Sequence, residues 1–218
     1  AERRGDLRAQ QAANRTGGRR LRDLADRYDD LDAILDEVKA YSERRMRAEI
    51  EALPDGDYGF KDVLDDDGQA DRDLPIEVTI TVDGASIVVD FEGTAGQVAG
   101  AVNAPFAVTA SATYYTIRCV TDPSIPPNAG AFRPIEIEAP ARSIVNAEPP
   151  AAVVGGNVET SQRVTDVLFG AIGSVAPARA AGAGQGTMNN ITFGGVDPRT
   201  DEPYTFYETI GGGSGGRA

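Results

Sequence analysis

The sequence predicts an α+β chain in which N-terminal amphipathic helices are followed by mixed β-sheet segments with packed helices. Over the first fifty residues, apolar side chains recur three or four positions apart, which is the period of a helix with one buried face. From Tyr58 onward, short apolar runs alternate with glycine- and proline-rich stretches, which is typical of strands and turns. We therefore expect a helical segment at residues 1–54 and an α+β core at residues 55–218.

The helical segment is expected to contain two helices. Apolar positions from Leu7 to Ala13 predict a first helix that breaks near Thr16-Gly17-Gly18, with helical spacing resuming before Tyr28. A longer amphipathic helix is predicted from Leu31 to Leu53, and Pro54-Asp55-Gly56 ends it. An amphipathic helix of this kind is expected to pack on a larger body.

The first part of the core carries a hairpin signature. Residues 77–82 and 86–91 alternate in strand fashion around Asp83-Gly84, a dipeptide that readily forms a tight type I′ turn. The apolar stretch Phe106–Val120 predicts a helix. Prolines at positions 123, 126 and 127 exclude regular structure between residues 121 and 128.

In the second part of the core, the sequence predicts four short strands and one helix. Residues 135–138 and 143–145 are expected to be strands separated by a turn at Pro140. A helix is expected from Thr160 to Val175, because its apolar residues fall along one side. Residues 191–193 and 204–210 are the remaining strands.

Charge restricts the classes of partner. The 218 residues carry a formal charge of -13 with a pI near 4.4, whereas a nucleic-acid or anionic-membrane partner requires a positive surface. We therefore expect neither. Nineteen of the 21 basic residues are arginines. Either adaptation of a carboxylate-rich surface to high salt or a codon bias toward arginine explains this ratio.

The single cysteine and the hydropathy suggest a cytoplasmic protein. Cys119 has no partner for an intrachain disulfide, so a reducing compartment is the natural assumption, and we expect its side chain to be a small buried hydrophobe. The sequence shows no apolar run of membrane-spanning length and no feature of a signal peptide.

The absence of histidine limits the chemistry available to this chain. It excludes a Ser-His-Asp triad, a Cys-His pair and any histidine-containing zinc site formed by its own residues. The run Asp65-Asp66-Asp67-Gly68 does not fit a calcium loop, because Val63 and Leu74 occupy the first and twelfth positions of an EF-hand register. We expect a structural acidic turn there.

The region from residue 155 to residue 190 holds the strongest candidate site. Glycines, amides, one acid and one arginine precede the helix at 160–175, and this composition suits a backbone that approaches a ligand closely. We expect these residues to face two later segments across a polar cavity. The candidate set is Asn157, Glu159, Thr160, Gln162, Arg163, Asn189, Asn190 and Glu208.

Simpler interpretations of the same residues remain open. The amides at the start of this helix could bind an anion, or Asn157 or Thr160 could merely cap the helix. Arg163 in the first turn indicates a partner carboxylate or a substrate anion. Glu159, four residues earlier, is the leading candidate, as an ordinary ion pair.

Several motifs in a fixed order resemble the hydantoinase B/oxoprolinase family, which also includes subunits of acetone and acetophenone carboxylases. The resemblance covers nearly the whole chain. The segments that carry it are residues 5–10, 41–47, 90–97, 103–105, 126–130, 133–135, 155–164, 185–190 and 207–213. Family subunits are more than twice as long, so we expect this chain to be a fragment, or one piece of a split subunit, incomplete at both ends.

The resemblance implies one part of a two-component enzyme. In such enzymes an A-type, ATP-binding subunit activates a cyclic amide and the B-type subunit completes ring opening, whereas the carboxylases act on ketones. By this resemblance, ATP and a divalent metal are expected in the full complex but not on this chain. The metal ligands of the carboxylase members precede the matching segment and cannot be assigned here. The alternatives are a non-catalytic assembly module or remnant, or part of a related ketone carboxylase. Self-association is also expected.

Overall fold

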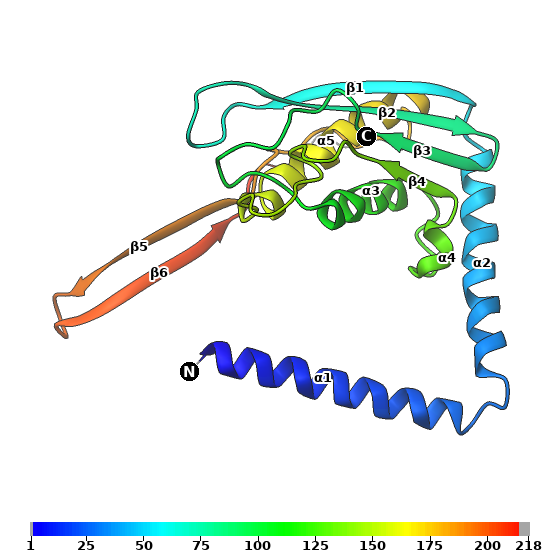
Figure 1. Ribbon diagram of the computed structural model, residues 1–218, viewed down its shortest axis with the longest axis horizontal. Helices are drawn as coiled ribbons and strands as arrows, with labels where there is room; N and C mark the ends of the chain where they lie inside the picture. Colours follow the sequence, from blue (N-terminus) through cyan, green and yellow to red (C-terminus); the bar gives the residue numbers. More distant parts are fainter. Residues whose placement is uncertain (1, 214–218) are drawn as a thin grey trace.

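Two long helices lead the chain in the computed structural model, which describes residues 2–213 (Figure 1). Helix α1 spans Glu2–Ala25 and stands apart from the body, and α2 spans Leu31–Glu51 along one end of it. The predicted break near Thr16-Gly17-Gly18 is wrong, because α1 continues through both glycines. Each glycine costs only about 1 kcal/mol relative to alanine, and the surrounding arginines, glutamines and alanines favour helix.

Helix α2 packs on the body through its second half. Ser42, Met46 and Ile50 are buried there, whereas Ile34 and Val38 in the first half are each 44% exposed. The expected packing is therefore confirmed only for the part of the helix that follows residue 41.

A four-stranded sheet forms the centre of the body. Its strands are β1 (Gly56–Leu64), β2 (Leu74–Asp83), β3 (Ser86–Asp90) and β4 (Ile135–Glu138), in that spatial order. The first three are antiparallel neighbours and β4 runs parallel to β3. Strands β2, β3 and β4 match the predictions, and β1 was not predicted.

The turn between β2 and β3 differs in type from the prediction. Asp83 pairs with Ser86, so the two-residue loop is Gly84-Ala85. Gly84 has φ +54 and is the only loop residue with positive φ, whereas a type I′ turn requires two.

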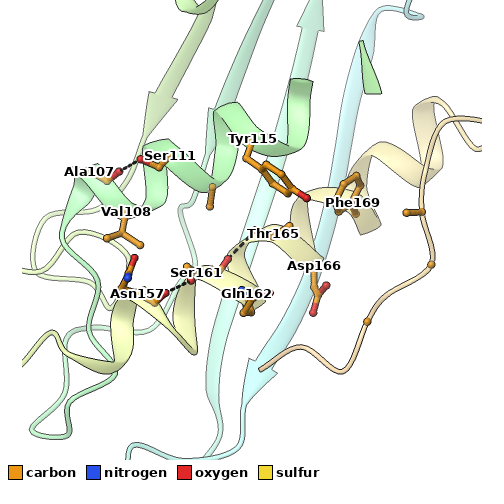
Figure 2. Close-up of a pocket in the computed structure, with 14 residues that line it drawn as sticks. Ala107, Val108, Ser111, Tyr115, Asn157, Ser161, Gln162, Thr165, Asp166 and Phe169 are labelled. Atoms are coloured by element: carbon orange, nitrogen blue, oxygen red, sulfur yellow. Dashed lines mark hydrogen bonds between the residues drawn. The ribbon is translucent and has the colours of Figure 1, made fainter. Parts of the chain in front are cut away.

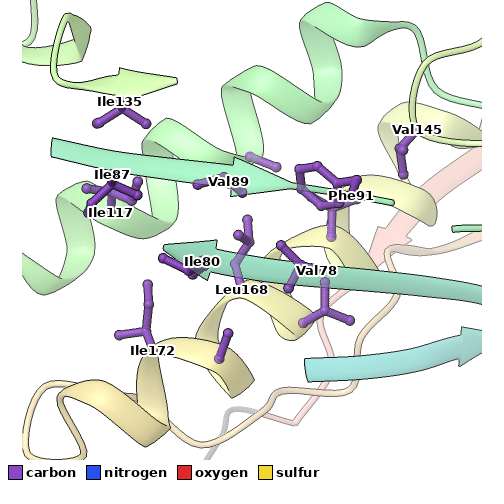
Figure 3. Packing of buried hydrophobic residues seen from close by; sticks show 14 of the residues in the cluster. Val78, Ile80, Ile87, Val89, Phe91, Ile117, Ile135, Val145, Leu168 and Ile172 are labelled. Atoms are coloured by element: carbon purple, nitrogen blue, oxygen red, sulfur yellow. The ribbon is translucent and has the colours of Figure 1, made fainter. Parts of the chain in front are cut away.

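Helices cover one face of the sheet. The 15-residue helix α3 (Phe106–Val120) and α5 (Thr160–Val175) have the predicted bounds; the short helix α4 (Ala129–Phe132) lies against α2, and η1 (Gly155–Asn157) is a 3₁₀ turn before α5. The even-numbered residues of β2 are buried against α3 and α5 (Figure 3). The core gathers Val78, Ile80, Ile117, Leu168 and Ile172 around this interface.

Two predictions about the rest of the body are wrong. Residues 143–145 form no strand, and only isolated bridges occur, at Ser143 with Gly96 and with Asn146. Cys119 is exposed rather than buried. Tyr115, four residues earlier on α3, is exposed as well, whereas Thr116 and Ile117 between them are buried.

The last two strands form a separate antiparallel hairpin. Strands β5 (Asn189–Asp197) and β6 (Glu202–Ile210) confirm and extend the predicted strands, and the hairpin projects from the body (Figure 1). Nearly all of its residues are exposed. Within residues 2–213, no helix combines the length and the apolar character needed to cross a bilayer.

Candidate functional site

The glycines before α5 make close contact with another part of the chain. A Cβ on Gly155 would lie 2.9 Å from the carbonyl oxygen of Ala101, and one on Gly156 would lie 2.1 Å from that of Asn103. Thr160 is fully buried, and its hydroxyl donates a hydrogen bond to the carbonyl of Val102. The glycine motif is thus held against the 101–104 segment, and its glycines are required for packing.

Asn103 fastens the segment that the glycines contact. Its buried Oδ1 accepts a hydrogen bond from the Val98 amide at 2.8 Å, while Nδ2 donates to the carbonyls of Val98, Gly100 and Ala152. A buried amide with all of these bonds made is rigid. The two motifs therefore form one fixed platform beneath the start of α5.

The amides around η1 are largely used by the fold. Those of Gly155, Val158, Glu159 and Gln162 donate to carbonyls of the chain. Glu159 occupies the N-cap position, and no side-chain capping bond forms there among the described residues. The alternative in which Asn157 or Thr160 caps the helix is therefore not observed.

Arg163 joins two carboxylates, but not the predicted one. Its Nη1 lies 2.5 Å from Oδ2 of Asp62 in β1 and 3.8 Å from Oδ2 of Asp166. The expected pair with Glu159 does not form, because α5 directs Arg163 toward β1. Gly186 covers the cluster closely: a Cβ there would lie 3.1 Å from Arg163 Nη2 and 3.0 Å from Asp166 Oδ2.

Asp166 lies at the edge of this cluster and on the wall of a cavity. Burial raises the pKa of its carboxyl, the Arg163 charge opposes that rise, and the Asp62 charge adds to it. The Nε of Arg163 is buried and has no hydrogen-bond partner among the described residues. Asp166 therefore takes up a proton more readily than an ordinary aspartate does.

A cavity of about 620 Å³ lies between α3 and α5 (Figure 2). Its polar groups include the hydroxyls of Ser111, Ser161 and Thr165, each of which donates to the carbonyl four residues earlier and keeps free lone pairs as an acceptor. Tyr115 also lines the cavity, and the side chain of Cys119 raises the pKa of its hydroxyl. The other polar lining residues are Asn157, Gln162 and Asp166.

A second hollow of about 400 Å³ lies on the other side of the start of α5. The acidic turn at residues 65–68, Glu159, Arg163 and Thr187 line it. Burial raises the pKa of the Glu159 carboxyl. The predicted site residues therefore diverge: Asn157 and Gln162 face the first cavity, Glu159 and Arg163 face the second, and Thr160 is buried between them.

The three remaining candidates lie on the β5–β6 hairpin. Asn190 Oδ1 accepts hydrogen bonds from the hydroxyls of Tyr207 at 2.7 Å and Thr209 at 2.8 Å. Asn189 and Glu208 are exposed positions of the same hairpin. From this region the structure brings Gly186 and Thr187, rather than Asn189, Asn190 or Glu208, to the start of α5.

Sequence reasoning missed three groups at the site. Asp166 follows Arg163 by three residues, which is a visible helical neighbour relation. Asp62 precedes Arg163 by 101 residues, and nothing in a single sequence signals such a contact. Tyr115 stands out in the sequence only as part of an apolar helix.

Comparison with known proteins agrees with this architecture. A family model described as hydantoinase B/oxoprolinase matches residues 1–218. The chain is 36% identical to "5-oxoprolinase 1" of Arabidopsis thaliana, covering 96% of this chain and 17% of that protein. It is 37% identical to the B-type subunit of a putative D-/L-hydantoinase of Pseudomonas sp. strain NS671, covering 98% of this chain and 38% of the relative.

A solved structure gives the same picture. The ATP-dependent caprolactamase from Pseudomonas jessenii superposes with a TM-score of 0.81 at 27% identity, over 94% of this chain and 36% of that one. The chain thus spans well under half the length of these relatives. The match over all 218 residues, together with this shared fold, shows that the chain belongs to the hydantoinase B/oxoprolinase family.

Proposed function

We propose that this chain forms the central part of the B-type component of an ATP-dependent cyclic-amide hydrolase and acts with an A-type, ATP-binding subunit. The likeness to the caprolactamase carries the proposal, because it extends over 94% of the chain and the name of that enzyme specifies both ATP dependence and a lactam. The B-type hydantoinase subunit supports it as a second relative whose name specifies a cyclic amide and a subunit.

The chemistry explains why two components are needed. An amide carbonyl is a poor electrophile, and phosphorylation of its oxygen by the A-type subunit would supply a leaving group. Ring opening then needs two waters. The first adds at that carbon, and the C–N bond of the adduct breaks as a proton is delivered to the departing nitrogen, which leaves an acyl phosphate. The second water hydrolyses the acyl phosphate and releases phosphate. This chain has no histidine, and its described residues contain no cluster of three or more metal-binding side chains. Its own side chains can bind and orient a substrate and exchange protons with it.

The contribution of this chain is to bind and orient the ring. Asn157 and Gln162 can each donate and accept a hydrogen bond, as a lactam does, and both line the cavity between α3 and α5. Asp166 at the same wall has a raised pKa and can hold or accept a proton. In this proposal the cavity is one wall of the chamber in which the activated ring is opened.

The test uses the reconstituted pair, with the B-type polypeptide containing residues 1–218. We expect Gln162→Ala and Asp166→Asn each to lower substrate-dependent phosphate release by at least about tenfold while co-elution with the A-type subunit is unchanged. Ser174→Ala, at an exposed position of the same helix, is the matched control. Measuring phosphate release with hydantoin, 5-oxoproline and caprolactam identifies the substrate class.

A non-catalytic assembly module is the second candidate. The exposed apolar residues of α2 and of the β5–β6 hairpin favour it, because such surfaces commonly mark contacts with other proteins. Full activity of both cavity variants would support this candidate and contradict the first.

The isolated chain is expected to be inactive. It has no histidine and no phosphate-binding Gly-Lys-Ser/Thr loop, so we expect neither ATP nor hydantoin hydrolysis by the purified 218-residue protein. A coupled phosphate assay checks this. Substrate-dependent phosphate release that persists through repeated purification would contradict it.

A further inference from the structure

One face of the four-stranded sheet is uncovered. The odd-numbered residues of β2 point away from α3 and α5, and Thr79 and Asp83 among them are exposed. The strand pairings extend this outer face across all four strands. It carries six carboxylates against a single lysine, Lys61, and these acids are Asp57, Glu77, Asp83, Asp90, Glu136 and Glu138.

The charge of helix α1 is opposite to that of the rest of the chain. It contains seven arginines and three acids, which is a net charge of +4. Because the whole chain has a net charge of -13, the remaining residues have a net charge of -17. At 3.6 residues per turn, five arginines fall within about 60° of one another around the helix axis. These are Arg4, Arg8, Arg15, Arg19 and Arg22, which we call the arginine stripe.

The arginine stripe has no partner within the described part of the chain. All five side chains are exposed, and none forms an ion pair with a residue in 2–213. Leu21 and Leu24 lie on another side of the helix, so the stripe itself is almost purely ionic. Helix α1 also stands clear of the body (Figure 1), which leaves it accessible to a second molecule.

We propose that α1 of one copy of this chain lies across the acidic outer sheet face of a second copy. Charge and length both match. The helix has 24 residues and is therefore about 36 Å long, and the ten residues of β2 extend about 34 Å. Contact would place the five guanidinium groups over a surface that has six carboxylates and one lysine, a net charge of -5. This inference concerns assembly and does not depend on the proposed function.

A second copy fits better than a membrane. The sheet face and the stripe belong to the same molecule, so association of copies pairs two surfaces that are both otherwise unpartnered in the described residues. An anionic bilayer would attract the stripe but repel the remaining charge of -17. The leucines of α1 are also too few for deep insertion, because the helix has only three.

The test measures the mass of the 218-residue protein by light scattering and its association constant by analytical ultracentrifugation. We expect self-association at about 0.05 M salt that weakens strongly by about 0.5 M, because exposed ion pairs are screened. Arg8→Glu with Arg15→Glu is expected to weaken it by roughly tenfold or more. Arg3→Glu with Arg20→Glu, the same change off the stripe, is the control.

A charge swap makes the test specific. Glu136→Lys with Glu138→Lys is expected to weaken association to a similar degree, and mixing this variant with Arg8→Glu/Arg15→Glu is expected to restore it. A monomeric wild type at low salt, equal effects of the stripe and control variants, or failure of the mixture to associate would each overturn the proposal. Binding of a monomeric wild type to phosphatidylserine vesicles, lost in Arg8→Glu/Arg15→Glu, would assign the stripe to membranes instead.

Discussion

Gly156 shows that a glycine before a helix can be required for close packing against another backbone segment. The Cβ of an alanine there would lie 2.1 Å from the backbone oxygen of Asn103, which cannot move without disturbing the buried Asn103 network. We expect Gly156→Ala to lower the free energy of unfolding by roughly 2–3 kcal/mol, the range for overpacking of a rigid site. Urea denaturation measures the change.

The control for this variant is Gly59→Ala in β1. The nearest atom to a Cβ at that position is the Val78 oxygen at 3.8 Å, an ordinary contact. We expect its stability to stay within about 0.5 kcal/mol of wild type or to rise slightly. Equal losses in the two variants would show that the close approach at Gly156 is not what requires glycine.

Asp67 makes the acidic turn a structural element with a defined response to pH. Its carboxylate accepts hydrogen bonds from the amides of Ala70, Gln69 and Gly100, and these bonds hold its pKa below the usual value for an aspartate. A lowered folded-state pKa means that this stabilisation is complete above the unfolded pKa and is lost as the pH falls through the folded pKa.

We therefore expect Asp67→Asn to be less stable than wild type near pH 7 and the difference to shrink below about pH 4. Unfolding free energies between about pH 2 and pH 7 test this. Asp66→Asn is the control, because Asp66 accepts one bond, from the exposed Gly68 amide. A stability gap for Asp67→Asn that stays constant with pH would contradict the assignment.

At the scale of elements, the spacing of apolar residues predicted the helices and strands that pack on the core. Helices α3 and α5 and the β2–β3 hairpin have regular apolar spacing, and each was predicted close to its observed bounds. Strand β1 was missed because Asp62 interrupts its inward row of Tyr58, Phe60 and Leu64. That interruption is the residue that pairs with Arg163. Asp62 is therefore the reason that both strand β1 and its ion pair with Arg163 were missed in the sequence.

The sequence predicted which segment forms the candidate site but not how its side chains are arranged in space. The glycine and amide motif before α5 correctly indicated an unusual helix start. It could not reveal that successive residues there face two different hollows, because that depends on where α3 and β1 lie. The pairing of Arg163 with Asp62 rather than Glu159 likewise follows from tertiary placement, which overrides the local helical preference.

The β5–β6 hairpin is expected to be the least stable strand pair. An isolated two-stranded hairpin is marginal in water. Its side-chain contacts include the pair Phe193 and Phe206, with ring centroids 4.9 Å apart. We expect its amides to exchange with deuterium much faster than those of β2, as followed by mass spectrometry. Equal protection of the two segments in the isolated chain would contradict this.

At the scale of the whole molecule, charge produces two opposite responses to salt. Association through the arginine stripe joins unlike charges, and screening weakens it. Folding of a chain with net charge -13 brings like charges together, and screening favours it. The average molar mass in solution and the melting temperature, measured in one salt series, therefore separate the two effects. We expect the average molar mass to fall as copies dissociate, while the melting temperature rises.

The upper end of that series distinguishes the two origins of the arginine-rich, lysine-poor composition. The Debye length falls from about 10 Å at 0.1 M to about 3 Å at 1 M, so screening of self-repulsion is largely complete by 1 M. We expect the melting temperature to rise up to that concentration in either case. A surface adapted to salt requires a continued rise well beyond about 1 M KCl, whereas codon bias alone predicts a plateau. Calorimetry from about 0.1 to 3 M KCl decides between them, and a melting temperature that falls from the outset would contradict both.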